Sequence, residues 1–209
     1  KIKDKPKITG ALIQIGDSKI NYDNWDENFI SQNEFFCPDK KIIKNWENLI
    51  KNARKEGSSL GAILEIRASG IPVGLGEPIY EKIDSDIAKA IMTINAVKGV
   101  EIGNGFKSVY ETGVSSIDEM GIENNKPVFY SNNNGGVLGG ISTGQDIICR
   151  FVVKPTSSIL STKKTIDTNL NETTISTKGR HDPCVGIRAV PVGEAMLAIT
   201  LADHCLRFL

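Results

Sequence analysis

The sequence has 209 residues, of which 40% are hydrophobic and 24% are charged, an ordinary composition for a globular protein. Twenty-five lysines and arginines balance 25 aspartates and glutamates, and no run of basic residues indicates a nucleic-acid-binding or membrane-surface protein. No apolar run approaches the ~20 residues that a membrane span needs. We therefore predict a single domain over 1–209, with neither nucleic acid nor membrane as a partner.

The four cysteines are scattered along the chain, at Cys37, Cys149, Cys184 and Cys205. Because they form no CxxC pair, neither a disulfide framework nor a metal site is predicted. With no signal peptide at the start of the sequence, the expected location is the reducing cytoplasm.

Strands and helices are predicted in the first half of the chain. Residues 8–15 are β-branched and aliphatic and predict a strand that ends at a turn at Gly16-Asp17. A helix is predicted from Pro38-Asp39 to Gly57, because apolar residues recur there with a period of 3.6. These inward residues are Ile42, Ile43, Trp46, Leu49, Ile50 and Ala53.

Residues 60–69 alternate between two faces, which predicts a half-exposed strand more typical of an antiparallel sheet. A loop rich in glycine and proline follows at 70–78. Asp84 or Ser85 is expected to cap a second helix that runs into 95–103. Its inward residues are expected to be Ile87, Ile91, Ile94 and Val97.

The second half of the chain begins with a polar stretch, 106–130, that predicts a surface excursion. A strand over 147–153 and a β-excursion over 162–177 follow, and the last helix is predicted from Glu194. The inward face of that helix is expected to comprise Ala195, Met196, Ile199, Ala202 and Leu206. Strands mixed with three helices, without strict βαβ alternation, predict an α+β fold.

Two polar stretches outside these elements are candidates for a binding site. Residues 131–144 hold five glycines and three asparagines, which would let a flat or anionic ligand approach the backbone amides. A tight series of turns explains this composition equally well. Residues 154–158 (KPTSS) add one ammonium and three hydroxyls, which suit a phosphate or a polar cofactor edge. A strand end with a Ser/Thr turn is the alternative.

A third stretch, 178–192, concentrates charged residues and is too rich in proline and glycine to predict a helix. Charged groups in irregular backbone beside a rigid element often build a site, although a solvated loop is the alternative. Asp182 and Arg180 are stronger candidates than His181, because the adjacent side chains of His181 and Asp182 often point apart.

Known nucleotide-binding motifs do not occur. Residues 135–143 lack the lysine of a P-loop, and 74–76 lack the third glycine of a dinucleotide fingerprint. Cys184 is interpreted as a small packing residue, and His204 as a core or surface histidine rather than a catalyst.

Taken together, five segments give the chain a strong resemblance to chorismate synthase. They are 69–78 (SGIPVGLGEP), 94–103 (INAVKGVEIG), 131–144, 154–158 (KPTSS) and 178–196. The resemblance implies an α+β sandwich of helices between antiparallel sheets, here incomplete, and a homotetramer. It also implies an enzyme that removes phosphate and a ring hydrogen from 5-enolpyruvylshikimate 3-phosphate to give chorismate, by a 1,4-anti elimination that needs reduced FMN.

The resemblance also implies roles for particular residues. Asp182 is expected to lie near the reactive nitrogen of the flavin and to help relay the proton, since a carboxylate can accept one in a site that raises its pKa. The residues expected to contact FMN are Asn95, Ala96, Gly139, Lys154, Pro155, Thr156, Ser157, Ser158 and Arg180. Whether NADPH bound by the same enzyme or an external reductant reduces the flavin stays open.

The chain departs from the family at its start. The N-terminal motifs of Gly-Glu-Ser-His-Gly and Arg-Gly-Gly-Gly-Arg type, which supply two catalytic histidines and the arginines that bind the substrate phosphates, do not occur, and neither His181 nor His204 lies in such a motif. We therefore expect the C-terminal portion of the enzyme, inactive by itself. A non-catalytic module that binds a flavin or an anion is the rival interpretation.

Overall fold

A computed structural model of the chain describes residues 5–179 and 181–208. The α-helices are α1 (Glu27–Ile30), α2 (Ile43–Lys55), α3 (Ile83–Met92) and α4 (Gly186–Phe208), and the 3-10 helices are η1 (Tyr22–Asn24), η2 (Lys40–Ile42) and η3 (Gly105–Tyr110). The strands are β1 (Lys7–Ile15), β2 (Ser18–Lys19), β3 (Ala62–Ser69), β4 (Val97–Ile102), β5 (Met120–Glu123), β6 (Lys126–Phe129), β7 (Val137–Leu138), β8 (Ile141–Ser142), β9 (Ile147–Val153), β10 (Lys163–Ile166) and β11 (Glu172–Ile175). This mixture confirms the predicted α+β class.

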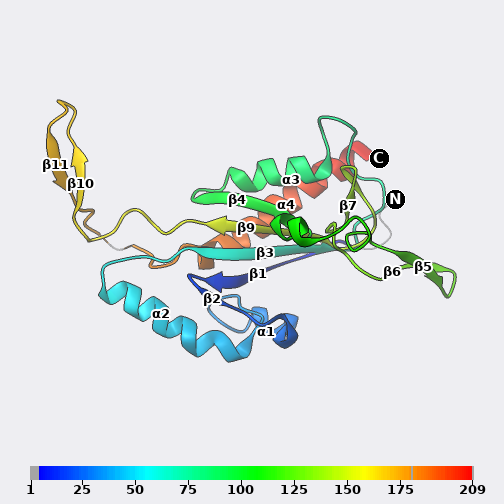
Figure 1. The fold of residues 1–209 in the computed structure, drawn as a ribbon, viewed down its shortest axis with the longest axis horizontal. Helices are drawn as coiled ribbons and strands as arrows, with labels where there is room; N and C mark the ends of the chain where they lie inside the picture. Colours follow the sequence, from blue (N-terminus) through cyan, green and yellow to red (C-terminus); the bar gives the residue numbers. More distant parts are fainter. Residues whose placement is uncertain (1–4, 180, 209) are drawn as a thin grey trace. The chain divides into compact units, whose positions relative to one another are not determined.

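Five strands are hydrogen-bonded in the order β2-β1-β3-β9-β4, and three hairpins form separate two-stranded sheets (Figure 1). The hairpins are β5–β6, β7–β8 and β10–β11. The predicted β-excursion over 162–177 is the hairpin β10–β11, whose strand residues are all exposed.

The chain divides into two compact units. Unit 1 takes its described residues from Lys1–Gly10, Glu65–Phe151 and Val190–Leu209, and unit 2 from Ala11–Leu64 and Val152–Ala189. Strands β1, β3 and β9 contribute residues to both. The interpretation of the chain as one domain stays a prediction.

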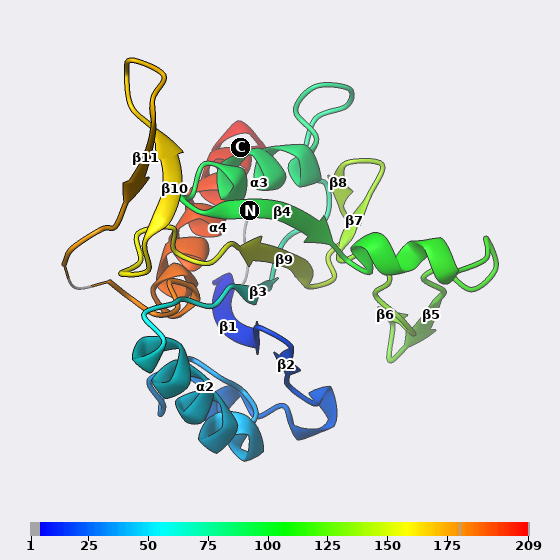
Figure 2. The ribbon, with the colours of Figure 1, turned by 60° about the vertical axis from the view of Figure 1, so that its left-hand side comes forward.

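In unit 1, α4 lies beside α3 (Figure 1 and Figure 2), and His204 Nε2 lies 3.0 Å from Asp86 Oδ2. The face of α4 that packs inward carries Val190, Leu197 and Leu201, all buried. The predicted inward face is therefore wrong, since Ile199 and Leu206 are 64% and 71% exposed. Both faces of α4 are apolar, so periodicity by itself does not indicate which one faces the core.

The start of α4 is also earlier than predicted, at Gly186 rather than Glu194. Gly186 lies so close to the side chain of Ala62 that a Cβ at this position would collide with it. The glycine therefore serves close packing rather than a turn. Pro191, inside the helix, lacks the N–H that would donate to the carbonyl of Ile187, and its ring crowds that carbonyl.

By length and composition, α4 is also the one helix in the described part of the chain that could cross a membrane. This is weak support for a membrane span, because core helices pass the same test. Glu194, in the middle of α4, accepts a hydrogen bond of 2.6 Å from the backbone N–H of Gly10. We interpret α4 as a helix packed within a folded unit.

Two further predictions for unit 1 are wrong at their boundaries. The second helix begins at Ile83, and Lys82 is its N-cap, so neither Asp84 nor Ser85 caps it. The helix is expected to run into 95–103 with Val97 on its inward face, but it ends at Met92, and Val97 begins the strand β4, which contains Gly99. Pairing with β9 in the sheet overrides the low strand propensity of that glycine.

The buried Glu65 corrects the prediction of a half-exposed strand β3. Its carboxylate pairs with Arg67 at 2.6 Å and with Arg150 on β9 at 3.2 Å. A buried carboxylate is tolerated where such partners satisfy it.

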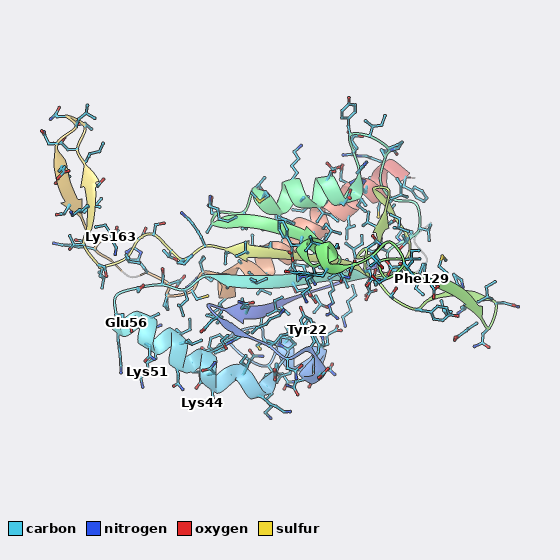
Figure 3. All side chains as sticks on the ribbon, in the orientation of Figure 1. Tyr22, Lys44, Lys51, Glu56, Phe129 and Lys163 are labelled. Carbon is cyan, nitrogen blue, oxygen red and sulfur yellow. The ribbon has the colours of Figure 1, made fainter. Side chains whose placement is uncertain are left out.

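In unit 2, α2 packs as the sequence predicts. Trp46 is fully buried, donates a hydrogen bond of 3.1 Å from its indole nitrogen to Ser18 Oγ, and meets Phe35 edge-on. Gly57, at φ +62°, ends the helix in the left-handed conformation that glycine favours. Lys44 and Lys51 project from the outer side of α2 (Figure 3).

Candidate functional site

The residues that the resemblance assigns to the site fall in both units. Unit 1 holds Asn95, Ala96 and Gly139, and unit 2 holds Lys154, Pro155, Thr156, Ser157, Ser158 and Asp182. Arg180 lies outside the described residues.

Asn95 and Ala96 form the turn between α3 and β4. The N–H of Val97 donates to the carbonyl of Ile94 at 3.2 Å, and Ala96 has φ +72°. A non-glycine residue in this conformation costs about 1–3 kcal/mol, and such strain concentrates at binding sites. The turn therefore holds the backbone of Ala96 in an unusual, fixed position.

Gly139 and Gly140 form the two-residue loop of the β7–β8 hairpin. Their φ values of +61° and +87° are those of a type I′ turn, in which both residues have positive φ. The carbonyl of Gly140 accepts a hydrogen bond of 2.9 Å from the N–H of Ile83. A Cβ at Gly139 would meet nothing within 4 Å, so the backbone there is open to a ligand.

The unit 1 candidates do not come together. Gly140 contacts Ile83 at the first residue of α3, whereas Asn95 follows its last residue, Met92 (Figure 1). Ten helical residues span about 15 Å, so Gly139 and Ala96 flank opposite ends of α3.

The asparagine-rich part of the 131–144 segment is held by a residue that the sequence does not single out, Asp118. Its carboxylate accepts hydrogen bonds from Ser131 Oγ at 2.6 Å and from the backbone N–H groups of Asn133 and Asn134 at 2.6 and 2.9 Å. Burial raises the pKa of Asp118, but hydrogen bonds from Ser131, Asn134 and Asn133 outweigh burial and leave the pKa below its usual value. The aperiodic segment 106–130 contains no pattern that predicts this role.

In unit 2, the KPTSS segment leaves the end of β9 and is tied to its surroundings through the backbone of Thr156. The carbonyl of Thr156 accepts a hydrogen bond of 2.7 Å from Ser59 Oγ. Its own hydroxyl donates to the backbone carbonyl of Asp182 at 3.4 Å. Lys154 Nζ donates to Ser157 Oγ at 3.2 Å. The structure therefore brings the side chain of Thr156 to the backbone of Asp182.

Both the side chain of Asp182 and the backbone next to it make contacts that hold them in place. Arg188, in the first turn of α4, places Nε 2.6 Å from Oδ2 and Nη2 3.4 Å from Oδ1. The next carbonyl, of Pro183, accepts a hydrogen bond of 2.7 Å from the N–H of Leu60. Cys184, which follows, is buried, and burial raises the pKa of its thiol, which suits a packing residue rather than a nucleophile.

A cavity of about 320 Å³ in unit 2 opens beside Asp182. It is lined by Ser158, His181 and Asp182, together with Arg54, Ser58 and Ser59 at the end of α2. The sequence prediction did not include Arg54, Ser58 or Ser59. The polar residues that follow Gly57 could have pointed to the two serines, whereas no sequence pattern marks Arg54 as a site residue. Among the described residues, no group of three or more His, Cys, Asp or Glu side chains could hold a metal ion.

The sequence matches the model of a known family. The chorismate synthase family model matches residues 3–206 of the chain. The chain belongs to the chorismate synthase family. It is 55% identical over 208 residues to the chorismate synthase of Agrobacterium fabrum (strain C58 / ATCC 33970), covering 99% of this chain and 57% of that protein. It is 59% identical over 200 residues to that of Rhodopseudomonas palustris (strain BisB5), covering 96% of this chain and 55% of that protein.

The fold agrees with this membership in the chorismate synthase family. A solved structure described as a crystal structure of chorismate synthase superposes with a TM-score of 0.80 at 30% identity, covering 98% of this chain and 58% of that one. The chain therefore spans little more than half the length of the family members that it matches.

Proposed function

We propose that this chain forms the flavin-binding part of an enzyme that uses reduced FMN to convert 5-enolpyruvylshikimate 3-phosphate to chorismate by 1,4-anti elimination of phosphate. The observation that carries the proposal is that Thr156 and Ser158 lie beside Asp182. Thr156 hydrogen-bonds to Asp182, and Ser158 lines the same cavity as Asp182.

The donor groups of the chain fit FMN. The ammonium of Lys154 and the hydroxyls of the same segment suit the ribityl and phosphate groups, and the open backbone at Gly139 suits the flat ring. We propose that Asn95, Ala96, Gly139, Lys154, Pro155, Thr156, Ser157, Ser158 and Arg180 hold the cofactor. When bound, reduced FMN supplies electron density to the substrate as the phosphate leaves and recovers it afterwards.

Asp182 has the role of proton carrier in this proposal. Elimination breaks a ring C–H bond and a C–O bond to phosphate, so a proton must leave the ring. We propose that a carboxylate oxygen of Asp182 takes up that proton, while Arg188 orients the carboxylate. Support comes from the two-point contact with Arg188 and from the side chain of Asp182, 41% of which is exposed and open to exchange with water.

We also propose that the chain by itself does not turn over, that the active form is a homotetramer, and that it works in the cytoplasm. The first point is supported by the relatives, of which the chain spans 55–57%. The cytoplasmic location is supported by Cys37, Cys149, Cys184 and Cys205, all free thiols. NADPH or an external reductant would keep the flavin reduced.

Anaerobic turnover of 5-enolpyruvylshikimate 3-phosphate with reduced FMN tests the proposal. Two proteins are compared: the chain, and a chimera that joins it to the part of the Agrobacterium fabrum relative that it does not match. We expect chorismate from the chimera alone, and none from its Asp182→Asn variant. An inactive chimera that still binds FMN would favour the rival function, a non-catalytic flavin-binding module. Chorismate formed by the chain alone would contradict the proposal that the chain does not turn over by itself.

A further inference from the structure

His181 carries a buried nitrogen without a partner. Its Nε2 atom is shielded from solvent and makes no hydrogen bond to any described residue. The only other buried side-chain atom of this kind in the described chain, His204 Nε2, lies 3.0 Å from a carboxylate oxygen of Asp86, although outside hydrogen-bond geometry. Burying an imidazole nitrogen without a hydrogen-bond partner costs free energy. We therefore expect a bound group to form a hydrogen bond with His181 Nε2.

Arg54 faces the same cavity from the last turn of α2. In the described ranges no carboxylate lies within ion-pair distance of its guanidinium. Free carbonyl groups at the end of α2 would repel an anion. The carbonyls of Asn52, Ala53 and Arg54 are not free, because each accepts a hydrogen bond from a backbone N–H group. The donors are Glu56, Ser58 and Gly57, in that order. The cavity therefore receives one uncompensated positive charge.

The remaining groups around the cavity suit an anion. The hydroxyls of Ser58 and Ser158 line it and make no hydrogen bond to the described residues. Asp182 also lines it, but its charge is balanced by Arg188, whose Nε lies 2.6 Å from Oδ2. A guanidinium, an imidazole and hydroxyls are the groups that bind phosphate oxygens.

We propose that Arg54 and His181, with Ser58 and Ser158, form an oxyanion subsite for the phosphate of a phosphomonoester. The proposal rests on the proposed function, because Ser158 and Asp182 belong to the proposed cofactor wall. Two sources have the required chemistry: the phosphate of FMN, and the phosphate that a substrate carries or releases. Arg54 and His181 then act as binding residues beyond those that the resemblance implies.

The test titrates the 209-residue chain with FMN, with riboflavin, which lacks the phosphate, and with inorganic phosphate. Flavin fluorescence follows the first two ligands, and ³¹P NMR follows the third. The variants are Arg54→Gln and Arg54→Lys. The matched control is Lys44→Gln, which removes the same charge from the outer side of α2 (Figure 3). Thermal unfolding confirms that each variant is folded.

We expect the chain to bind FMN at least about tenfold more tightly than riboflavin, because charge-assisted hydrogen bonds to phosphate are strong. Arg54→Gln should remove most of that difference, Arg54→Lys should keep part of it, and Lys44→Gln should keep all of it. In the unaltered chain, the imidazole ¹⁵N resonances of His181 should shift with FMN and not with riboflavin.

The outcomes separate this subsite from the proposed function. FMN binding that does not depend on Arg54, with unshifted His181 resonances, would overturn the subsite and leave the proposed function intact. Binding of inorganic phosphate that depends on Arg54, without FMN binding, would support the subsite and contradict the flavin. If neither ligand binds, the subsite is wrong.

Discussion

Asp182 and Arg188 form a two-point ion pair, with Nε 2.6 Å from Oδ2 and Nη2 3.4 Å from Oδ1. Both side chains are partly exposed, at 41% and 73%. Exposed pairs contribute about 0–1 kcal/mol to stability, because water screens the charges. The pair therefore matters for where the Asp182 carboxylate points more than for holding the fold together.

Replacing Arg188 separates its effect on the orientation of Asp182 from its effect on the stability of the fold. We expect Arg188→Ala to lower the free energy of unfolding by less than about 1 kcal/mol in urea denaturation. Turnover by the chimera should fall much further, because the proton-carrying carboxylate loses its orientation. Lys44→Ala, which breaks the exposed pair with Glu47 at 3.4 Å, serves as the control and should leave turnover unchanged. Unaltered turnover in Arg188→Ala would refute the orienting role.

Asp118 should make a pH-dependent contribution to stability. Its hydrogen bonds to Ser131, Asn133 and Asn134 hold its pKa below the usual value, so its stabilising effect is present above about pH 4 and is lost as the pH falls through the folded-state pKa. We expect Asp118→Ala to cost about 1–3 kcal/mol at pH 7. Urea denaturation of both proteins at pH 7 and pH 3 checks this, and a difference that grows towards acid pH would contradict it.

The orientation of α4 can be tested with two leucines on opposite faces. Leu197 is 1% exposed and Leu206 is 71% exposed. We expect Leu197→Ala to lower the free energy of unfolding by about 2–5 kcal/mol through a cavity, and Leu206→Ala to change it by no more than about 0.5 kcal/mol. The reverse order would mean that the face predicted from the sequence packs inward after all.

Gly139 has open space where a side chain would lie, whereas Gly76 is closely packed. Gly139→Ala meets no atom within 4 Å and should cost only about 1–2 kcal/mol, the penalty for alanine at positive φ. Gly76→Ala would collide with the carbonyl of Gly140 and should destabilise the chain far more. If Gly139 contacts FMN, its alanine variant should still weaken FMN binding, which a fluorescence titration measures. Equal losses of stability in the two variants would contradict the difference in packing.

Local patterns in the sequence correctly indicated several elements. The β-branched run of 8–15 became β1, the 3.6 periodicity around Trp46 became α2, and Gly57 ended that helix. In each case one residue pattern and one preferred backbone conformation agree, so no distant contact is needed to decide between alternatives.

The errors concern features that depend on distant residues. Gly186 and Pro191 look like helix breakers, yet both lie in α4. Position 186 needs a glycine because Ala62 leaves no space for a side chain there. Likewise, Gly99 lies in β4 because the sheet pairs that segment with β9.

The sequence by itself determined the family, the α+β class and the segments that carry the candidate site, because spaced motifs and periodicity are properties of the chain alone. Only the tertiary structure decided which face of α4 is buried. It also decided that Arg188 forms an ion pair with Asp182 and that Arg54 and His181 line the same cavity. Arg54 and His181 lie more than a hundred residues apart in the sequence. Their proximity is set by the packing of α2 within unit 2, which no local pattern encodes.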